Sequence, residues 1–222
     1  MCPHACDLCA SIDPAVTDCA LQRHLGPGRH CVVAATASAT AIPTIGAFVP
    51  GYLLVVPRRH VLTLGQLPPP DLHDLERLTC HVAARLTEIY AMPVLGFEYG
   101  LDITGERRVE HAHLHLVPTF ADLAGWLSER LNGLTLRALS SLAGQAASYI
   151  AVLQVGAGGV RVYPVPRNSS PRIRLREAVA ALDSRVPPGA WDWHAWPFPR
   201  LMRRTIDDLA ANRHAVISRS SQ

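Results

Sequence analysis

The segment that most constrains the fold is residues 111–118, which read HAHLHLVP. Successive side chains of a β-strand point to opposite faces of a sheet, so this alternation predicts a strand with one apolar face and one imidazole face. We expect the apolar face to pack into a core and His111, His113 and His115 to line a pocket together. With an unperturbed pKa of about 6.5, imidazole can act as nucleophile, acid or ligand near neutral pH. Metal capture by a histidine-rich tract, or three surface histidines, are the alternatives.

Periodic apolar residues elsewhere in the chain predict an α+β fold. Leucines recur at helical spacing from Leu72 to Leu86, so residues 71–92 are predicted to form one amphipathic helix whose apolar stripe covers a sheet. β-branched and apolar runs between Gly and Pro predict the strands of that sheet. These strands are expected at residues 31–36, 46–56, 94–99 and 110–118. Residues 1–30 are rich in Cys, His, Pro and Gly, and we expect an irregular arm with at most one short helix near residues 14–25.

Weaker patterns follow residue 120. We expect helices at residues 121–131, 172–182 and 201–211, and a hairpin made by residues 148–155 and 160–165. This half contains no second histidine triad, so we favour a C-terminal extension over a degenerate second copy of the fold. The predicted organisation is a main domain with an N-terminal arm, residues 1–120, followed by an extension, residues 121–222.

Composition argues against several classes of protein. The 222 residues are 49% hydrophobic, enough for one core plus a substantial extension. The formal charge is only +3, so we expect neither nucleic acid nor a membrane surface as partner. No apolar run reaches the roughly 18 residues of a membrane span, and residues 1–8 lack the pattern of a signal peptide, so we expect a cytoplasmic protein. The six cysteines are then better interpreted as thiols or metal ligands than as disulfides.

Two segments of the chain resemble the histidine-triad (HIT) family of nucleotide hydrolases and transferases. The family signature is His-x-His-x-His followed by two apolar residues, with apolar x, and residues 111–117 match it completely. Residues 50–60, which read PGYLLVVPRRH, resemble the strand beside the triad strand in that family. The resemblance covers roughly residues 5–120 and implies a HIT-like antiparallel sheet with the long helix packed on it. Residues 121–222 would add an α/β C-terminal extension.

The resemblance implies covalent catalysis at His113. In the family the middle histidine attacks the phosphorus next to the nucleoside and forms a nucleotidyl-histidine, which water or another acceptor then opens. His115 would contact the phosphoryl oxygens, and His111 completes the triad. One nitrogen of His113 should donate to a carbonyl of the same strand, which fixes the tautomer. The implied substrate is a small-molecule nucleoside 5′-phosphoryl compound, with phosphorolysis as an open variant, and homodimers are common in the family.

A metal site is implied at the N-terminal arm. The pair Cys6 and Cys9 by itself fits a metal site, free thiols or a redox pair. Some bacterial members of the family hold a structural zinc ion with such a pair, the histidine after the Val-Pro-basic-basic run, and the first triad histidine. Carried over here, the zinc ligands are Cys6, Cys9, His60 and His111, with Cys2 and His4 as substitutes. Such a closed set is structural, and the chemistry itself requires no metal.

The sequence departs from the family where substrate is bound. Tyr52 stands where many members have a fourth histidine, and no Asp or Glu lies between Asp18 and Asp71, where members commonly hold the ribose. The candidate substrate contacts are Tyr52, Glu98 and Arg107. These departures motivate an alternative function, a non-catalytic zinc-stabilised nucleotide-binding or regulatory module.

The extension offers two further groups of residues. Arg172, Arg174 and Arg176 fit a phosphate clamp, but a solvated helix face is the favoured interpretation. The tryptophans within residues 191–196 favour a packing plug over a platform for a base. The extension could still close over the pocket.

Overall fold

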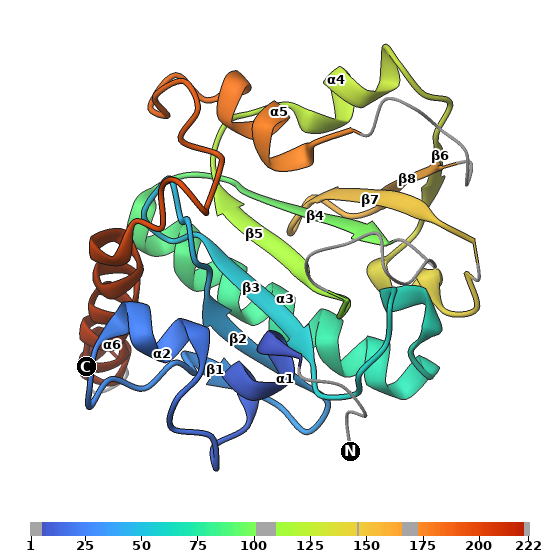
Figure 1. Cartoon of the computed structure of the whole chain (residues 1–222). Coiled ribbons are helices and arrows are strands. Elements are labelled where there is room, and N and C mark those ends of the chain that lie inside the picture. Colours follow the sequence, from blue (N-terminus) through green and yellow to red (C-terminus); the bar gives the residue numbers. More distant parts are fainter. Residues whose placement is uncertain (1–5, 101–109, 146, 166–172, 220–222) are drawn as a thin grey trace.

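The computed structural model describes residues 6–100, 110–145, 147–165 and 173–219, with side chains described as far as residue 212. Within these residues, eight strands form one antiparallel sheet in the order β1-β2-β3-β5-β4-β7-β8-β6 (Figure 1). The strands are β1 (Ala34–Ala35), β2 (Ala39–Pro43), β3 (Leu53–Pro57), β4 (Val94–Gly100), β5 (Leu114–Pro118), β6 (Leu134–Leu136), β7 (Tyr149–Gln154) and β8 (Val160–Pro164). The α-helices are α1 (Asp7–Ile12), α2 (Ala20–Leu25), α3 (Pro69–Tyr90), α4 (Leu123–Ser128), α5 (Leu175–Leu182) and α6 (Pro199–Arg219), and the short 3-10 helices are η1 (Leu64–Gln66) and η2 (Leu139–Leu142). The α+β fold expected from the sequence is confirmed.

Helix α3 is the long helix predicted from the leucine spacing, displaced toward the N-terminus. It begins at Pro69 because proline in the first turn has the required φ and lacks an N–H that would need a partner. It ends at Tyr90, and Ala91 caps it with left-handed backbone at φ 52°. Its buried residues cover one face of the sheet and form a core with residues such as Leu53 and Leu114.

The main domain differs from the sequence-based expectations in several places. The strands predicted at residues 31–36 and 110–118 are shorter than expected, as β1 and β5. Residues 44–52 form a loop, so only the end of the strand predicted at residues 46–56 pairs, as β3. Strand β2 was not predicted because its five residues are all buried and show no alternation. The N-terminal arm contains two short helices, α1 and α2, instead of at most one.

The strands of the extension continue the sheet of the main domain. Strand β7 pairs with β4 from Leu95 opposite Gln154 to Gly100 opposite Tyr149, and β8 pairs with β7 as the predicted hairpin. Strand β6, which was not predicted, forms the edge beside β8. The division at residue 120 stays a prediction, and the sheet itself is continuous across it.

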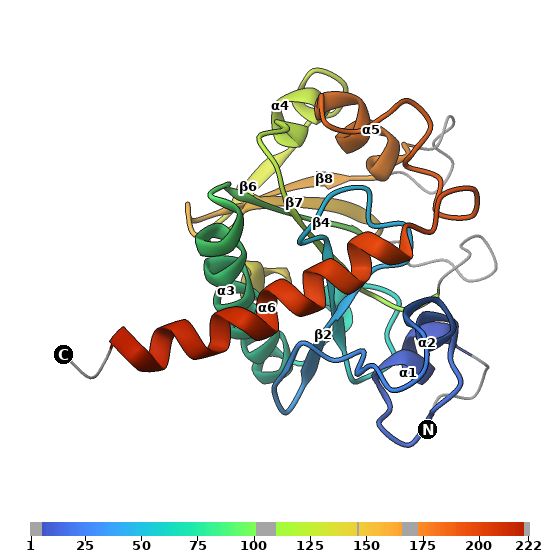
Figure 2. The same cartoon turned by 90° about the vertical axis from the view of Figure 1, so that its left-hand side faces the viewer.

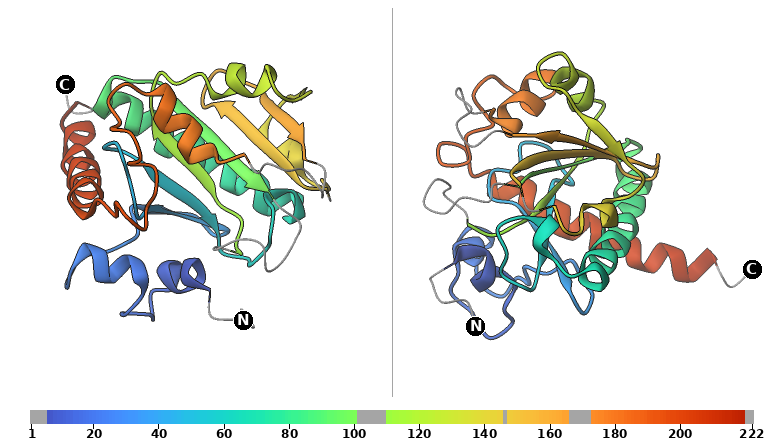
Figure 3. Two further views of the ribbon diagram at one scale, coloured as in Figure 1. Left: turned by 45° about the horizontal axis from the view of Figure 1, so that its top comes forward. Right: turned by 90° about the vertical axis from the view of Figure 1, so that its right-hand side faces the viewer.

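The opposite face of the sheet carries a second core. Residues of α4, α5 and the N-terminal arm pack on this face (Figure 3). Leu54 and Val56 of β3 belong to this core, whereas Leu53 and Val55 belong to the core under α3. Helix α6 contacts α2, α3 and β2 and runs along the side of the molecule (Figure 2). None of the helices in the described part of the chain has the length and apolar composition needed to span a membrane.

Two glycines dock the loop of residues 44–52 onto the C-terminal half. The N–H of Gly46 donates to the carbonyl of Pro197 over 2.8 Å, and that of Gly51 donates to Oγ1 of Thr205 over 2.8 Å. Both glycines have positive φ, +74° and +81°, which other residues rarely adopt. A Cβ at Gly46 would lie 2.3 Å from Cβ of Trp193, so glycine permits the close approach of the two segments.

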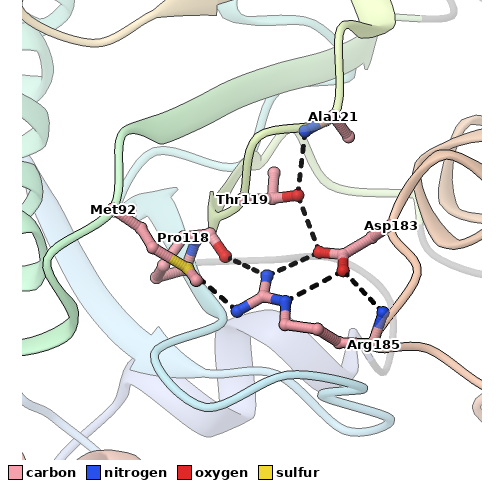
Figure 4. A network of polar contacts seen from close by, with 6 residues as sticks. All are labelled: Met92, Pro118, Thr119, Ala121, Asp183 and Arg185. Carbon is pink, nitrogen blue, oxygen red and sulfur yellow. Dashed lines mark hydrogen bonds and ion pairs between the residues drawn. The ribbon is translucent and has the colours of Figure 1, made fainter.

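A buried carboxylate connects the end of β5 to the segment after α5 (Figure 4). Oγ1 of Thr119 donates to Asp183 over 2.7 Å, and the guanidinium of Arg185 donates to Asp183 and to the carbonyl of Pro118. Burial opposes ionisation of Asp183, but the hydrogen bonds from Arg185 and Thr119 outweigh it and lower its pKa to about 2. The carboxylate therefore stays charged in the folded protein at neutral pH.

Replacing Asp183 by Asn is expected to lower the free energy of unfolding at pH 7 by about 1–3 kcal/mol, because it leaves charge-assisted hydrogen bonds unmade. The pKa of Asp183 is about 2 when folded and 3.8 when free, so its stabilisation is complete above about pH 4 and is lost as pH falls through 2. The variant should thus lose less stability on acidification, as measured by urea unfolding. Asp18→Asn, whose ion pair with Arg23 is exposed, is the matched control and should change little.

Candidate active site

A cavity of about 1270 Å³ lies on the face of the sheet opposite α3. Three parts of the chain line it: the sheet, the N-terminal arm with α1 and α2, and the extension with α4, α5 and the segment after α5. His113 and His115 both lie in its wall. Small-molecule sites typically enclose about 300–1000 Å³, so this cavity accommodates a large ligand. Residues of the extension thus form part of the wall of the pocket that contains the two histidines.

His113 has one ring nitrogen committed to the backbone. Its Nδ1 lies 2.7 Å from the carbonyl oxygen of His111. A contact of this kind, to a carbonyl of the same segment, was predicted from the sequence. A carbonyl oxygen can only accept, so in the neutral ring Nδ1 carries the proton and Nε2 carries the lone pair. The ring is held in the tautomer that a nucleophilic Nε2 requires.

Tyr52 holds His115 in the opposite tautomer. Tyr52 Oη lies 2.8 Å from Nδ1 of His115, and Nη1 of Arg176 donates to the same Oη over 3.2 Å. Because the guanidinium can only donate, the phenol directs its own proton toward His115. Nε2 of the neutral His115 ring then carries the proton and is a hydrogen-bond donor.

His115 is a neutral donor rather than a cation. Burial, together with the nearby His113 and Arg176, lowers its pKa well below the usual value. The ring stacks on Phe97 with centroids 4.5 Å apart, and the ring of His113 lies 4.8 Å away. His115 can therefore donate a hydrogen bond to a ligand without adding positive charge to the cavity.

The structure places Tyr52 behind the cavity wall rather than in it, which corrects the expectation of a direct substrate contact. Its side chain is 0% exposed, and burial raises the pKa of the phenol to about 12 although Arg176 acts in the other direction. Tyr52 thus keeps its proton and orients His115.

Arg176 lies at the cavity, whereas the sequence pattern favoured a solvated helix face. Its side chain is half-buried at the start of α5, with Nε 3.2 Å from the carbonyl oxygen of Trp191 and Nη2 bonded to the carbonyl of Gly46. Its guanidinium carbon lies 5.1 Å from the ring centroid of Tyr52. No local pattern could have found this role, because these partners come from two other segments, the loop of residues 44–52 and the segment after α5.

Four potential metal ligands converge beside the cavity. The donor atoms of Cys6, Cys9, His60 and His111 all lie within 4.8 Å of one another. Sγ of Cys9 lies 3.4 Å from Nδ1 of His60 and 3.3 Å from Nδ1 of His111. Nε2 of His111 lies 2.9 Å from the carbonyl oxygen of Pro57, so it carries the proton and leaves Nδ1 as the ligand atom. This cluster could hold a metal ion.

The triad histidines therefore divide between two neighbouring sites. His111 is 0% exposed, with Nδ1 facing the cysteines and Nε2 facing the backbone. Only His113 and His115 line the cavity. The expectation that all three imidazoles line one pocket is corrected, because His111 belongs to the Cys and His cluster.

Of the other two predicted substrate contacts, the structure describes only Glu98, which is not part of the cavity wall. Glu98 is 1% exposed and accepts hydrogen bonds from Tyr149 Oη over 2.7 Å and from the N–H of Leu64 over 2.8 Å. These partners belong to the α3 face, so alternation along β4 directs Glu98 away from His115, and we do not retain it as a substrate contact. Arg107 lies outside the described residues.

Three tryptophans of the extension line the cavity. Trp126, Trp191 and Trp193 are all part of its wall, where the sequence favoured a packing plug for the last two. Acidic residues also reach the wall from outside the early strands. These include Asp7, Glu177 and Asp192, which were not considered as ligands of a ribose.

Comparison with known proteins gives a match to the part of the chain that carries His113 and His115. A family model, the HIT domain, matches residues 29–122. That segment contains β1 to β5, α3, and both His113 and His115. Residues 29–122 are thus similar to the HIT domain family. The search of curated proteins gave no significant match.

Several solved structures are similar to this chain. One is a HIT-like protein involved in cell-cycle regulation from Bartonella henselae, at 18% identity over 39% of this chain and 66% of that chain, with a TM-score of 0.35. The match thus spans just under two thirds of that protein. A hypothetical histidine triad nucleotide-binding protein from Sulfolobus tokodaii is 12% identical over 81% of this chain and 85% of its own, with a TM-score of 0.37. Yeast Ap4A phosphorylase is 13% identical over 68% of each chain, with a TM-score of 0.41.

Replacing His115 by Gln is expected to make the free energy of unfolding less dependent on pH on the acid side of neutrality. The pKa of His115 is lower in the folded protein than its usual 6.5, so the unfolded state binds the proton more readily and wild-type stability falls as pH drops through 6.5. Between about pH 7.5 and pH 5, the variant should lose roughly 1–2 kcal/mol less free energy of unfolding than wild type. Urea unfolding at both pH values measures this. His73→Gln, an exposed change on α3, is the matched control, and identical slopes for H115Q and wild type would contradict a neutral His115.

Proposed function

We propose that this protein is a histidine-triad hydrolase or nucleotidyltransferase that cleaves a nucleoside 5′-phosphoryl compound through a nucleotidyl-histidine on His113. The observation that carries the proposal is the pair of opposite tautomers in one cavity wall, a lone pair on Nε2 of His113 and an N–H on Nε2 of His115. Dinucleoside polyphosphates and nucleoside phosphoramidates are substrates of this class. The HIT domain match over residues 29–122 supports the assignment.

The two rings have complementary parts in the first step. Nε2 of His113 attacks phosphorus, a nitrogen–phosphorus bond forms, and the leaving group departs with the electrons of its bond to phosphorus. Negative charge on the non-bridging oxygens is stabilised by the N–H of His115. The carbonyl of His111 accepts from Nδ1 of His113 and favours the positive charge that the ring acquires.

The second step regenerates the enzyme. An oxygen of water or another acceptor attacks phosphorus, the nitrogen–phosphorus bond to His113 breaks, and its electrons return to Nε2 as the lone pair. The acceptor loses its proton to solvent. Hydrolysis, phosphorolysis and transfer differ only in this acceptor, so the same two histidines serve all three outcomes.

The four-residue cluster fits structural zinc. In a tetrahedral site with Zn–S near 2.3 Å and Zn–N near 2.0–2.1 Å, a sulfur and a nitrogen lie about 3.6 Å apart. The sulfur–nitrogen distances from Cys9 to His60 and His111, 3.4 Å and 3.3 Å, are close to this value. Two thiolates and two imidazoles complete the set, so the ion would connect the N-terminal arm to the segment that carries His113.

Replacing His113 by Ala is expected to lower kcat for hydrolysis of adenosine 5′-phosphoramidate by about a thousandfold or more, because the nucleophile is lost. Rapid quenching without acid, followed by mass spectrometry, should detect an AMP adduct on wild type only. His73→Ala, an exposed change on the α3 side, is the control. No turnover and no adduct with wild type would favour the alternative, a zinc-stabilised binding or regulatory module.

Elemental analysis of the protein expressed with ample metal is expected to find about one equivalent of zinc. Cys9→Ser should lose most of it and destabilise the fold, because it removes one of four ligands. Cys80→Ser changes an exposed thiol on α3 and should keep the full content. Less than about a tenth of an equivalent in wild type would contradict the zinc site.

A further inference from the structure

Besides the two histidines, the cavity wall contains a positively charged side chain, that of Arg176. Three arginines line it, and two have a carboxylate partner close by in the sequence. Arg130 pairs with Glu129 over 3.0 Å, and Arg174 pairs with Glu177 over 3.7 Å. Arg176 has no ion pair with any carboxylate among the described residues, although Asp7, Glu177 and Asp192 share the cavity with it.

The bonding of Arg176 holds a charge in place without neutralising it. Its three described hydrogen-bond partners are neutral oxygens, the carbonyls of Trp191 and Gly46 and the phenol of Tyr52. A guanidinium has five N–H donors, so these bonds fix the plane of the group and leave donors for a ligand. A half-buried cation fixed by neutral partners in a cavity wall is suited to bind an anion.

Arg176 lies close to His115, which contacts the phosphoryl group in the proposed reaction. Its Nη1 is 3.2 Å from Tyr52 Oη, which is 2.8 Å from Nδ1 of His115, so the guanidinium and that ring nitrogen are at most about 6 Å apart. His115 and Tyr52 are both neutral, so neither balances the charge of a phosphate. A phosphoryl group against His113 and His115 is within reach of the guanidinium.

We propose that Arg176 binds the anionic phosphoryl group of the substrate, so that the extension supplies the fixed positive charge of the active site. This inference rests on the proposed function for the phosphoryl substrate, but concerns a different residue and a binding role. Arg176 donates to phosphate oxygens, and its hydrogen bond to Tyr52 keeps the phenol proton directed at His115. Anion binding and the tautomer of His115 are thereby coupled.

Calorimetric titration of the zinc-loaded full-length protein with AMP, and with adenosine as the uncharged comparison, tests the inference. Arg176→Gln should weaken AMP binding by about tenfold or more and leave adenosine binding within about twofold, because a charge-assisted contact to phosphate is lost. Arg176→Lys, which keeps the charge, should recover part of the AMP affinity. Arg77→Gln, an exposed change on α3, is the control. Equal AMP affinity for R176Q and wild type would overturn the inference, and so would an equal loss for AMP and adenosine.

Turnover separates this inference from the proposed function. Hydrolysis of adenosine 5′-phosphoramidate with unchanged kcat/KM in R176Q would refute the role of Arg176 and leave catalysis by His113 intact. Binding of AMP that depends on Arg176, without turnover or adduct in wild type, would support the anion site and refute the enzyme.

A measurement on wild type covers the case in which R176Q does not fold. The side-chain Nε–H resonance of Arg176 can be assigned by its absence from R176K. Addition of AMP should shift this resonance, whereas adenosine should not. A resonance that does not respond to saturating AMP would overturn the inference.

Discussion

Strand β5 is hydrogen-bonded to β3 on one side and to β4 on the other, and this pairing places His115 between Leu54 and Phe97. Both faces of the sheet are buried, so the side-chain alternation has one acceptable register: leucines toward α3 and imidazoles toward the cavity. A shift by one residue would put His115 into the apolar core. The orientation of His115 toward the cavity is thus fixed by the same apolar burial that stabilises the sheet.

Much of this arrangement could be predicted from local sequence. Alternation in residues 111–118 predicted the strand, leucine spacing predicted α3, and the matched motifs indicated the four-residue Cys and His cluster. The first two features are local patterns, whereas the set of four ligands was implied by the resemblance to the HIT family. Strand β2, buried along its whole length, has no such periodicity, and its assignment required its partner β3.

The residues that were misjudged depend on contacts between distant segments. Glu98 is polar and lies on β4, the strand beside β5, so the sequence suggested a substrate contact. The pleat of β4 instead directs its side chain toward Tyr149 on the other face of the sheet. Arg176 and Tyr52 are 124 positions apart and share a hydrogen bond through Tyr52 Oη. Such pairs have no sequence period, because the docking of the extension onto the sheet creates them.

The pairing of β4 with β7 has a consequence for a fragment that would contain only the residues matched by the HIT domain model. The matched region ends at residue 122, whereas β4 bonds to β7 along its length, from Leu95 to Gly100. A fragment that ended there would expose a bare row of amide and carbonyl groups beside uncovered apolar side chains. Unprotected edges of this kind recruit strands from other molecules, so proteolytic removal of the C-terminal half would generate an aggregation-prone species rather than a smaller folded protein.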